Sequence, residues 1–129
     1  MPDPIRTGLP EPSQPFSWAT HVGSLMFTAH GAVDSAGKIA GGDVATQTRL
    51  TFDNLAATVA AAGASMTDVA QVLIYMRDAQ DMATIDAVYR EYFSVPYPNR
   101  ASVAVQGFVH PEMLIEIVAY VRIPPQPGT

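Results

Sequence analysis

The chain has 129 residues, 48% of them hydrophobic and 15% charged, and it carries a formal net charge of −5. These values exclude a disordered chain and favour one compact domain, and the excess of acidic groups disfavours nucleic acid as a partner because Lys and Arg must neutralise its phosphates. The absence of cysteine excludes disulfides, thiolate nucleophiles and cysteine metal ligands.

The first 15 residues are expected to form an extended leader. Prolines lie at positions 2, 4, 10, 12 and 15, and a proline cannot donate a backbone hydrogen bond. No basic segment leads into an apolar run at the N-terminus, and nowhere do about 18 apolar residues follow one another. We therefore expect a cytoplasmic protein with no membrane partner.

Two short strands joined by a tight turn are predicted at residues 16–21 and 25–30. Both segments are rich in apolar and aromatic residues, and Val22-Gly23-Ser24 between them is a typical turn sequence. A second turn sequence follows the hairpin, and it precedes a short edge strand predicted at Ile39-Ala40.

A long helix is predicted over residues 44–62. Asp43 can accept hydrogen bonds from the free amides at the start of this helix, and apolar residues recur at spacings that keep them near one face. Gly63 is expected to end the helix, because glycine readily adopts the positive φ angle required there.

A central strand, a second helix and two last strands complete the predicted chain. Residues 69–76 are almost continuously apolar and rich in β-formers, which is typical of a strand inside a sheet. The second helix is predicted to begin at Asp81 as its N-cap and to end before Pro96. The last two strands are expected at residues 101–105 and 114–123.

The predicted order is βββαβαββ, which indicates an α+β domain with both helices on one face of a mixed sheet. The other face of the sheet would then be open and apolar, and a second subunit is the simplest cover for it. The folded domain is expected to span residues 16–123, between the leader 1–15 and a C-terminal tail of residues 124–129.

Several segments, in their order and spacing, resemble the RidA (YjgF-type) family over residues 14–123. These segments are Asp43-Val44-Ala45-Thr46-Gln47-Thr48, Asp53-Asn54-Leu55, Ala62-Gly63-Ala64, Tyr75-Met76-Arg77-Asp78, Tyr89-Arg90-Glu91-Tyr92-Phe93, Tyr97-Pro98-Asn99-Arg100-Ala101-Ser102 and Leu114-Ile115-Glu116-Ile117-Val118-Ala119. The resemblance implies a chorismate mutase-like fold and a homotrimer with ligand pockets at the subunit interfaces. It also implies hydrolysis of reactive enamines or imines to a 2-keto acid and ammonia without a cofactor.

Arg100 corresponds to the arginine of the family's Pro-x-Arg motif, which pairs with the substrate carboxylate. A guanidinium group is permanently charged, and its planar fork can bind both carboxylate oxygens. We therefore expect Arg100 to anchor a small carboxylate-bearing molecule, with backbone groups near Ala101 orienting it. The alternative is a structural arginine bonded to carbonyls or to a neighbouring acid.

Two positions depart from the family pattern. Ala29 stands where the family commonly has serine, and Val118 stands where the imine-hydrolysing branch has a glutamate that positions or activates water. Glu116 shares a strand face with Val118 and could act on a shifted water, although we favour a structural bond within the trimer. His30 replaces a family glycine, and it could either transfer protons in the pocket or simply pack on the strand.

Three further residues are candidates for the pocket wall. Phe16 replaces a family tyrosine, Tyr97 precedes the Pro-x-Arg motif, and Asp86 stands where relatives can have asparagine. For Tyr97 and Asp86 we prefer a plain structural role. The histidines of the chain show no metal-ligand spacing, so we expect no metal site.

The expected function is hydrolysis of an enamine or imine carboxylate by an enzyme in which Arg100, His30 and Glu116 take part in catalysis. Because the family serine and glutamate are missing, two alternatives stay open. One is a non-catalytic trimer that binds a carboxylate metabolite as a sensor or chaperone-like partner. The other is a related catabolic deaminase or tautomerase.

Overall fold

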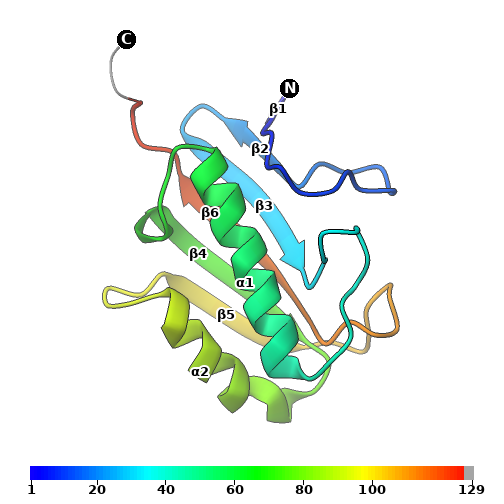
Figure 1. Ribbon diagram of the computed structural model, residues 1–129. Helices are drawn as coiled ribbons and strands as arrows, with labels where there is room; N and C mark the ends of the chain where they lie inside the picture. The colour runs from blue at the N-terminus through cyan, green and yellow to red at the C-terminus, as the bar shows by residue number, and fades with distance from the viewer. Residues whose placement is uncertain (127–129) are drawn as a thin grey trace.

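A six-stranded sheet and two α-helices form two layers in the computed structural model, which describes residues 1–126 (Figure 1). The strands are β1 (Asp3–Pro4), β2 (Ala19–Val22), β3 (Leu25–Gly31), β4 (Val69–Met76), β5 (Asn99–Ala104) and β6 (Ile115–Arg122), and the helices are α1 (Val44–Ala61) and α2 (Met82–Tyr92). Short 3₁₀ turns, Met66–Asp68 and Ala79–Asp81, precede β4 and α2.

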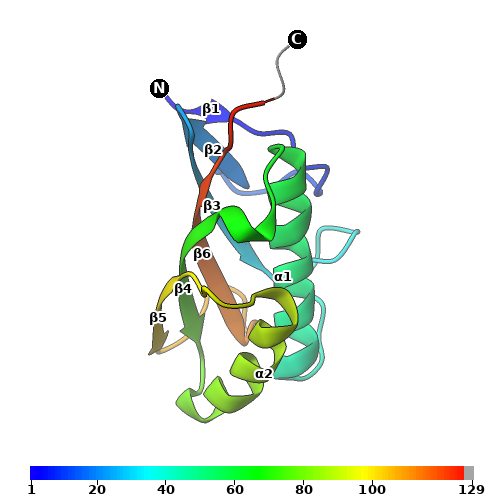
Figure 2. The same cartoon turned by 90° about the vertical axis from the view of Figure 1, so that its left-hand side faces the viewer.

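The strands lie in the order β1-β2-β3-β6-β4-β5, with β4 and β5 parallel and all other neighbours antiparallel. Both helices cover one face of this sheet, as the edge-on view in Figure 2 shows. Alternate residues of the inner strands point towards the helices and are fully buried, as Ile115, Ile117 and Ala119 of β6 illustrate. The predicted α+β fold with its mixed sheet is therefore confirmed.

The caps of α1 agree with the sequence. The Asp43 carboxylate accepts a hydrogen bond of 2.9 Å from the backbone N–H of Thr46, and Gly63 follows the helix with a φ angle of +76°. An L-residue with a side chain would be strained at that angle, so glycine ends the helix with the least backbone strain.

The N-terminal strands differ from the prediction. The edge strand expected at Ile39-Ala40 is a single bridge between Val33 and Ile39, because the Asp34 carboxylate accepts hydrogen bonds from two later amides and folds this segment onto itself. The hairpin begins at Ala19 and not at residue 16. The third strand of the βββ unit is β1, inside the leader, where Pro4 is tolerated because β1 is an edge strand.

The start of α2 also differs from the prediction. The Asp81 side chain makes no capping hydrogen bond. Asp78 instead accepts a hydrogen bond of 2.9 Å from the backbone N–H of Gln80, and the 3₁₀ turn that it caps leads directly into the helix. Of the predicted C-terminal tail, residues 127–129 lie outside the described part of the chain.

No element of residues 1–126 covers the face of the sheet opposite the helices (Figure 2). Its side chains are mostly apolar and partly exposed; they come from Leu25, Phe27, Ala29, Leu73, Tyr75, Ala101, Val103, Glu116, Val118 and Tyr120. We call this set the open face. Phe27 and Tyr120 pack edge to face at its centre, with ring centroids 5.6 Å apart.

Candidate active site

Arg100 lies on the edge strand β5, with its side chain on the helix side of the sheet. Its Nη1 donates a hydrogen bond of 2.7 Å to Oδ1 of Asp86 in α2. The guanidinium carbon lies 4.8 Å from the centroid of the Tyr89 ring, close enough for a cation–π contact. Both charged side chains remain about a quarter exposed, at 27% for Arg100 and 28% for Asp86. The strand and the helix therefore present a paired but accessible guanidinium.

A pocket of about 190 Å³ lies around this pair. Its lining residues are Asp86, Tyr89, Arg90, Tyr97, Pro98 and Arg100. Three of them, Arg100, Asp86 and Tyr97, were candidates from the sequence. Tyr89 and Arg90 were not, although they lie three and four residues after Asp86 and therefore share its face of α2. That spacing is the signal that could have found them.

Most donors of the Arg100 guanidinium are unused. Within residues 1–126, Arg100 donates a side-chain hydrogen bond to Asp86 alone. The Tyr89 hydroxyl and the Ser102 Oγ also have no partner in the described chain, but both atoms are fully buried and not open to the pocket. Burial raises the pKa of Tyr89. The free donors of Arg100 can therefore bind an anion.

His30 lies elsewhere, on the helix side of β3. Three strand spacings put about 14 Å between β3 and β5, and His30 is level with Ser102, so His30 and Arg100 are farther apart still. Thr28 Oγ1 donates its one proton to the Trp18 carbonyl at 2.6 Å, so at 2.8 Å it must accept from Nε2 of His30. This bond fixes the tautomer of His30, and its Nδ1 has no partner among residues 1–126.

The surroundings of His30 keep its imidazole neutral. The residue is 2% exposed, and burial lowers its pKa from 6.5 to about 4. The ring stacks on Trp18 with centroids 5.8 Å apart. Within one chain His30 thus packs on the strand, which was one of the two interpretations of its sequence position, and it does not reach the pocket of Arg100.

The other candidate residues lie on or near the open face. Ala29 and Val118 are direct cross-strand neighbours, and Glu116 is level with Gly31 on one side and Tyr75 on the other. The Glu116 carboxylate makes no hydrogen bond within the part of the chain that the structure describes, and burial raises its pKa. The Glu116 carboxylate therefore lies on the face of the sheet opposite the Arg100 side chain.

Two candidates at the margins complete the set. Phe16 is 47% exposed and packs edge to face against Trp18, with ring centroids 5.0 Å apart. Ala101 points to the open face from β5, one residue after Arg100. The candidates Arg100, Asp86 and Tyr97 thus line one pocket on the helix side, whereas Ala29, Ala101, Glu116 and Val118 lie on the open face. One chain does not bring these two groups together, and His30 and Phe16 belong to neither.

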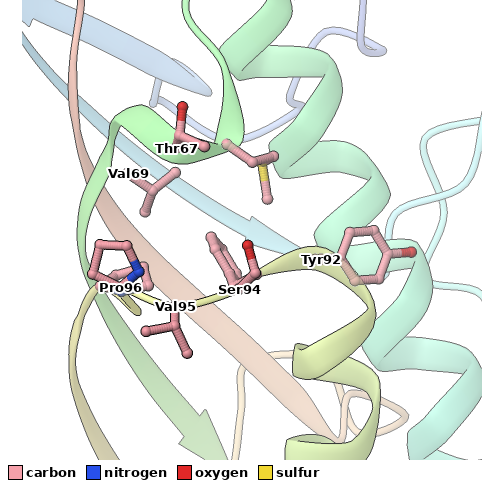
Figure 3. A pocket seen from close by; sticks show the side chains of 9 residues that line it. Thr67, Val69, Tyr92, Ser94, Val95 and Pro96 are labelled. Carbon is pink, nitrogen blue, oxygen red and sulfur yellow. The ribbon is translucent and has the colours of Figure 1, made fainter.

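A second cavity, of about 100 Å³, lies between the 3₁₀ turn before β4 and the loop from α2 to β5 (Figure 3). It is lined by Met66, Thr67, Val69, Tyr92, Phe93, Ser94, Val95, Pro96 and Pro98. No charged side chain is among them, so this cavity offers hydroxyl groups but no cation to a carboxylate. The pocket at Arg100 is the stronger candidate.

Neither a cluster of metal-ligating side chains nor a membrane-spanning helix is found among residues 1–126. Residues 1–126 contain no group of three or more His, Asp or Glu side chains placed to hold a metal ion. Over the same residues, neither helix combines the length and the apolar character that crossing a bilayer requires.

Sequence comparison matches residues 7–123 to a family model described as Endoribonuclease L-PSP. A RutC family protein of Pyrococcus horikoshii is 38% identical over 113 residues, which cover 85% of this chain and 88% of that protein. A 2-iminobutanoate/2-iminopropanoate deaminase of Dermatophagoides farinae is 33% identical over 98 residues, covering 74% of this chain and 77% of its own. Relatives with such names support a deaminase-type enzyme in general.

Structural comparison gives the same grouping. Escherichia coli TdcF with bound serine superposes with a TM-score of 0.83 and 31% identity, covering 93% of this chain and 98% of TdcF. RidA from the Antarctic bacterium Psychrobacter has a TM-score of 0.85 and 27% identity, covering 92% of this chain and 98% of that one. Fold, family model and relatives agree, and the chain belongs to the RidA (YjgF-type) family.

Proposed function

We propose that the protein binds a small carboxylate through Arg100 and hydrolyses an imine or enamine of the same molecule to a keto acid and ammonia. The observation that carries this proposal is the state of the Arg100 guanidinium. It lines an accessible pocket and uses one hydrogen bond, to Asp86, so most of its fork is free for a ligand. The bound serine in the TdcF structure, a molecule that bears a carboxylate, supports the same kind of ligand.

The backbone of β5 supports this binding mode. β5 is an edge strand, so part of its N–H and C=O groups have no sheet partner and can orient the ligand beside Ala101. In the reaction, water adds to the carbon of the C=N bond. The C–N bond of the adduct then breaks, ammonia leaves, and the keto acid remains.

Assembly into a homotrimer is part of the proposal. The open face is apolar and uncovered, which favours burial against further copies of the chain. The Arg100 pocket and the residues Ala29, Glu116 and Val118 lie on opposite faces of one sheet, so only a neighbouring subunit can complete the pocket with a second group. Glu116 is then a candidate to position water across the interface.

A non-catalytic carboxylate-binding trimer is the second candidate. It is favoured by one observation, that Ala29 and Val118 place two apolar side chains opposite each other where the family pattern has serine and glutamate. A protein that keeps the anchoring arginine and lacks these two groups would bind the ligand without turning it over. A related catabolic deaminase or tautomerase acting on another substrate remains a variant of the enzyme proposal.

Cleavage of RNA, which the description of the family model names, is not proposed for this chain. The sequence has seven Lys and Arg residues against twelve Asp and Glu, so its field repels a phosphate backbone. RNA binding would have to overcome this repulsion.

The enzyme proposal is tested with enamine generated freshly by a threonine or serine dehydratase, while the release of keto acid is followed. The wild-type protein is expected to accelerate release over buffer, and Arg100→Ala to abolish the acceleration while subunit assembly is unchanged. Arg49→Ala is a matched control, because Arg49 is an exposed arginine paired with Glu91 away from the pocket. No acceleration, together with Arg100-dependent binding of a keto acid, would favour the non-catalytic candidate.

A further inference from the structure

The ion pair between Asp86 and Arg100 leaves hydrogen-bonding groups of both side chains unused, and we call it the open pair. Arg100 Nη1 and Asp86 Oδ1 form one hydrogen bond of 2.7 Å, and Asp86 Oδ2 accepts no hydrogen bond within residues 1–126. A second arginine–acid pair, between α1 and α2, uses both oxygens of its carboxylate. Arg49 binds Glu91 through two hydrogen bonds of 3.2 and 2.9 Å, which occupy both carboxylate oxygens. One pair is thus satisfied within the chain, whereas the other keeps an acceptor and several donors free.

The open pair is not explained by its contribution to stability. An ion pair that is about a quarter exposed gains little, because water screens the attraction and two side chains must be ordered. Asp86 nevertheless neutralises the charge of Arg100 at the place where the ligand binds. A ligand that carried only a carboxylate would put a second acid on the same guanidinium and would be repelled by Asp86.

A cationic nitrogen beside the carboxylate would reverse that repulsion. Such a group meets the free oxygen of Asp86 while the carboxylate of the same molecule meets the free edge of the guanidinium. The hydrogen bond of 2.7 Å between Nη1 and Oδ1 holds the two protein groups side by side, so a ligand that carries its carboxylate and its nitrogen on adjacent atoms can reach both. An electrically neutral pair then binds an electrically neutral zwitterion.

We propose that Asp86 is a specificity-determining residue and that the Asp86–Arg100 pair recognises both charges of a 2-ammonio or 2-iminio carboxylate. Arg100 takes the carboxylate, and Asp86 takes the cationic nitrogen. This inference rests on the proposed binding of a carboxylate by Arg100, and it adds a binding partner for the nitrogen of the substrate. It selects the protonated imine over the neutral enamine, and it lowers the affinity for the keto acid product, which has lost the nitrogen.

Tyr89 restricts the guanidinium at this pair. The residue is 4% exposed and lines the pocket, and its ring lies against the guanidinium, which limits the rotation of Arg100. The position of the unpaired side of the fork is therefore restricted before a ligand binds.

The test compares ligands of one carbon skeleton by calorimetric titration of the full-length protein near neutral pH. The probes are L-2-aminobutanoate, 2-oxobutanoate and butanoate. We expect the wild-type protein to bind aminobutanoate about tenfold or more tightly than the other two, as one charge-assisted hydrogen bond implies. Asp86→Asn should lower the affinity for aminobutanoate about tenfold and raise that for 2-oxobutanoate, so that the preference disappears. Glu91→Gln, which removes an acid from the same helix, should change neither affinity.

Three results would overturn the inference, and one of them would also contradict the proposed function. An unchanged preference in Asp86→Asn, or equal weakening of all three probes, would mean that Asp86 only holds Arg100 in place. Binding that is insensitive to Arg100→Ala would overturn the inference and the proposed function together. Asp86→Ser serves as a second variant should Asp86→Asn fail to fold, since the partly exposed position tolerates a small polar side chain.

Discussion

Ala29 of β3 and Val118 of β6 lie directly opposite each other on neighbouring antiparallel strands. Side chains in such a pair are about 5 Å apart and in contact. At these same two positions the resemblance described in the sequence analysis leads us to expect serine and glutamate. Both departures therefore fall on one spot of the open face, where a hydroxyl and a carboxylate would have been neighbours.

Restoring both groups tests what this spot contributes. The double variant Ala29→Ser, Val118→Glu is expected to hydrolyse 2-iminobutanoate at least about tenfold faster than the wild-type protein, because a positioned acid–base group contributes that much or more. The assay follows release of 2-oxobutanoate from enamine made by threonine dehydratase. Each single variant should gain less than the pair. A double variant that stays folded and trimeric without any gain would show that the spot does not face the substrate.

Arg100→Lys separates charge from shape at the anchor. Lysine keeps the positive charge and loses the planar fork, so it cannot bind both carboxylate oxygens and leave a donor for Asp86. We expect kcat/KM on the imine to fall about tenfold to 100-fold in Arg100→Lys, and further in Arg100→Ala. Activity of Arg100→Lys equal to that of the wild type would mean that charge alone anchors the ligand.

His30 should make stability depend on pH. The folded protein holds the pKa of His30 at about 4, below the 6.5 of the unfolded chain, so the unfolded state binds the extra proton as pH falls between these values. Stability is therefore fully present above pH 6.5 and decreases towards pH 4, by about 3 kcal/mol in all.

The measurement is urea unfolding at about pH 7 and pH 5 and at constant protein concentration. His30→Gln should remove most of the pH dependence within this window. His21→Gln is the control, because His21 is partly exposed and hydrogen-bonded to the carbonyl of Gly23, and it should keep the dependence. A slope that persists in His30→Gln would assign it to other groups.

Gln47 is expected to be a strong determinant of stability. The side chain is 1% exposed; its Nε2 donates to the Glu112 carbonyl at 2.8 Å, and its Oε1 accepts from the Leu114 amide at 2.9 Å. Gln47→Ala leaves two backbone groups without partners and should lower the free energy of unfolding by about 2–3 kcal/mol. Gln80→Ala, at an exposed glutamine, should change it by less than about 0.5 kcal/mol in the same denaturation experiment.

The proposed trimer is tested on the open face. Phe27 packs on Tyr120 on the open face, two residues along β3 from Ala29, so Phe27→Asp puts a charge where the proposed interface would bury it. We expect this variant to sediment as a monomer while the wild-type protein sediments as a trimer. Ala60→Asp, at an exposed position of α1, should leave the trimer intact. A monomeric wild-type protein would contradict the assembly proposal directly.

Much of the fold could be predicted because local signals and packing agree in most elements. The Asp43 cap, the Gly63 stop and the apolar run of β4 each have a physical cause within a few residues of sequence. The errors lie in strands whose pairing partners are distant in the sequence. Nothing near Pro4 indicates a strand, since it is β2, 16 residues later, that offers Pro4 and Asp3 a partner.

The site could be predicted only as separate residues. The sequence identified Arg100 and Asp86 without showing that they are bonded, because the bond depends on how α2 packs across β5. It also placed His30 and Ala29 together, although alternation along β3 sends their side chains to opposite faces, one buried and one exposed. Neighbours in sequence thus belong to different environments, and strand order decides which of them can share a pocket.

The short strand β1 has a consequence for how the molecule can aggregate. A bare edge strand invites another chain to continue the sheet, which is the first step towards a fibril. Here Asp3 and Pro4 occupy the outer side of β2, and Pro4 has no N–H to offer an incoming strand. The proline-rich leader therefore prevents another chain from adding a strand at the β1 edge of the sheet. This protection matters in a protein whose open face is apolar and can bind other chains.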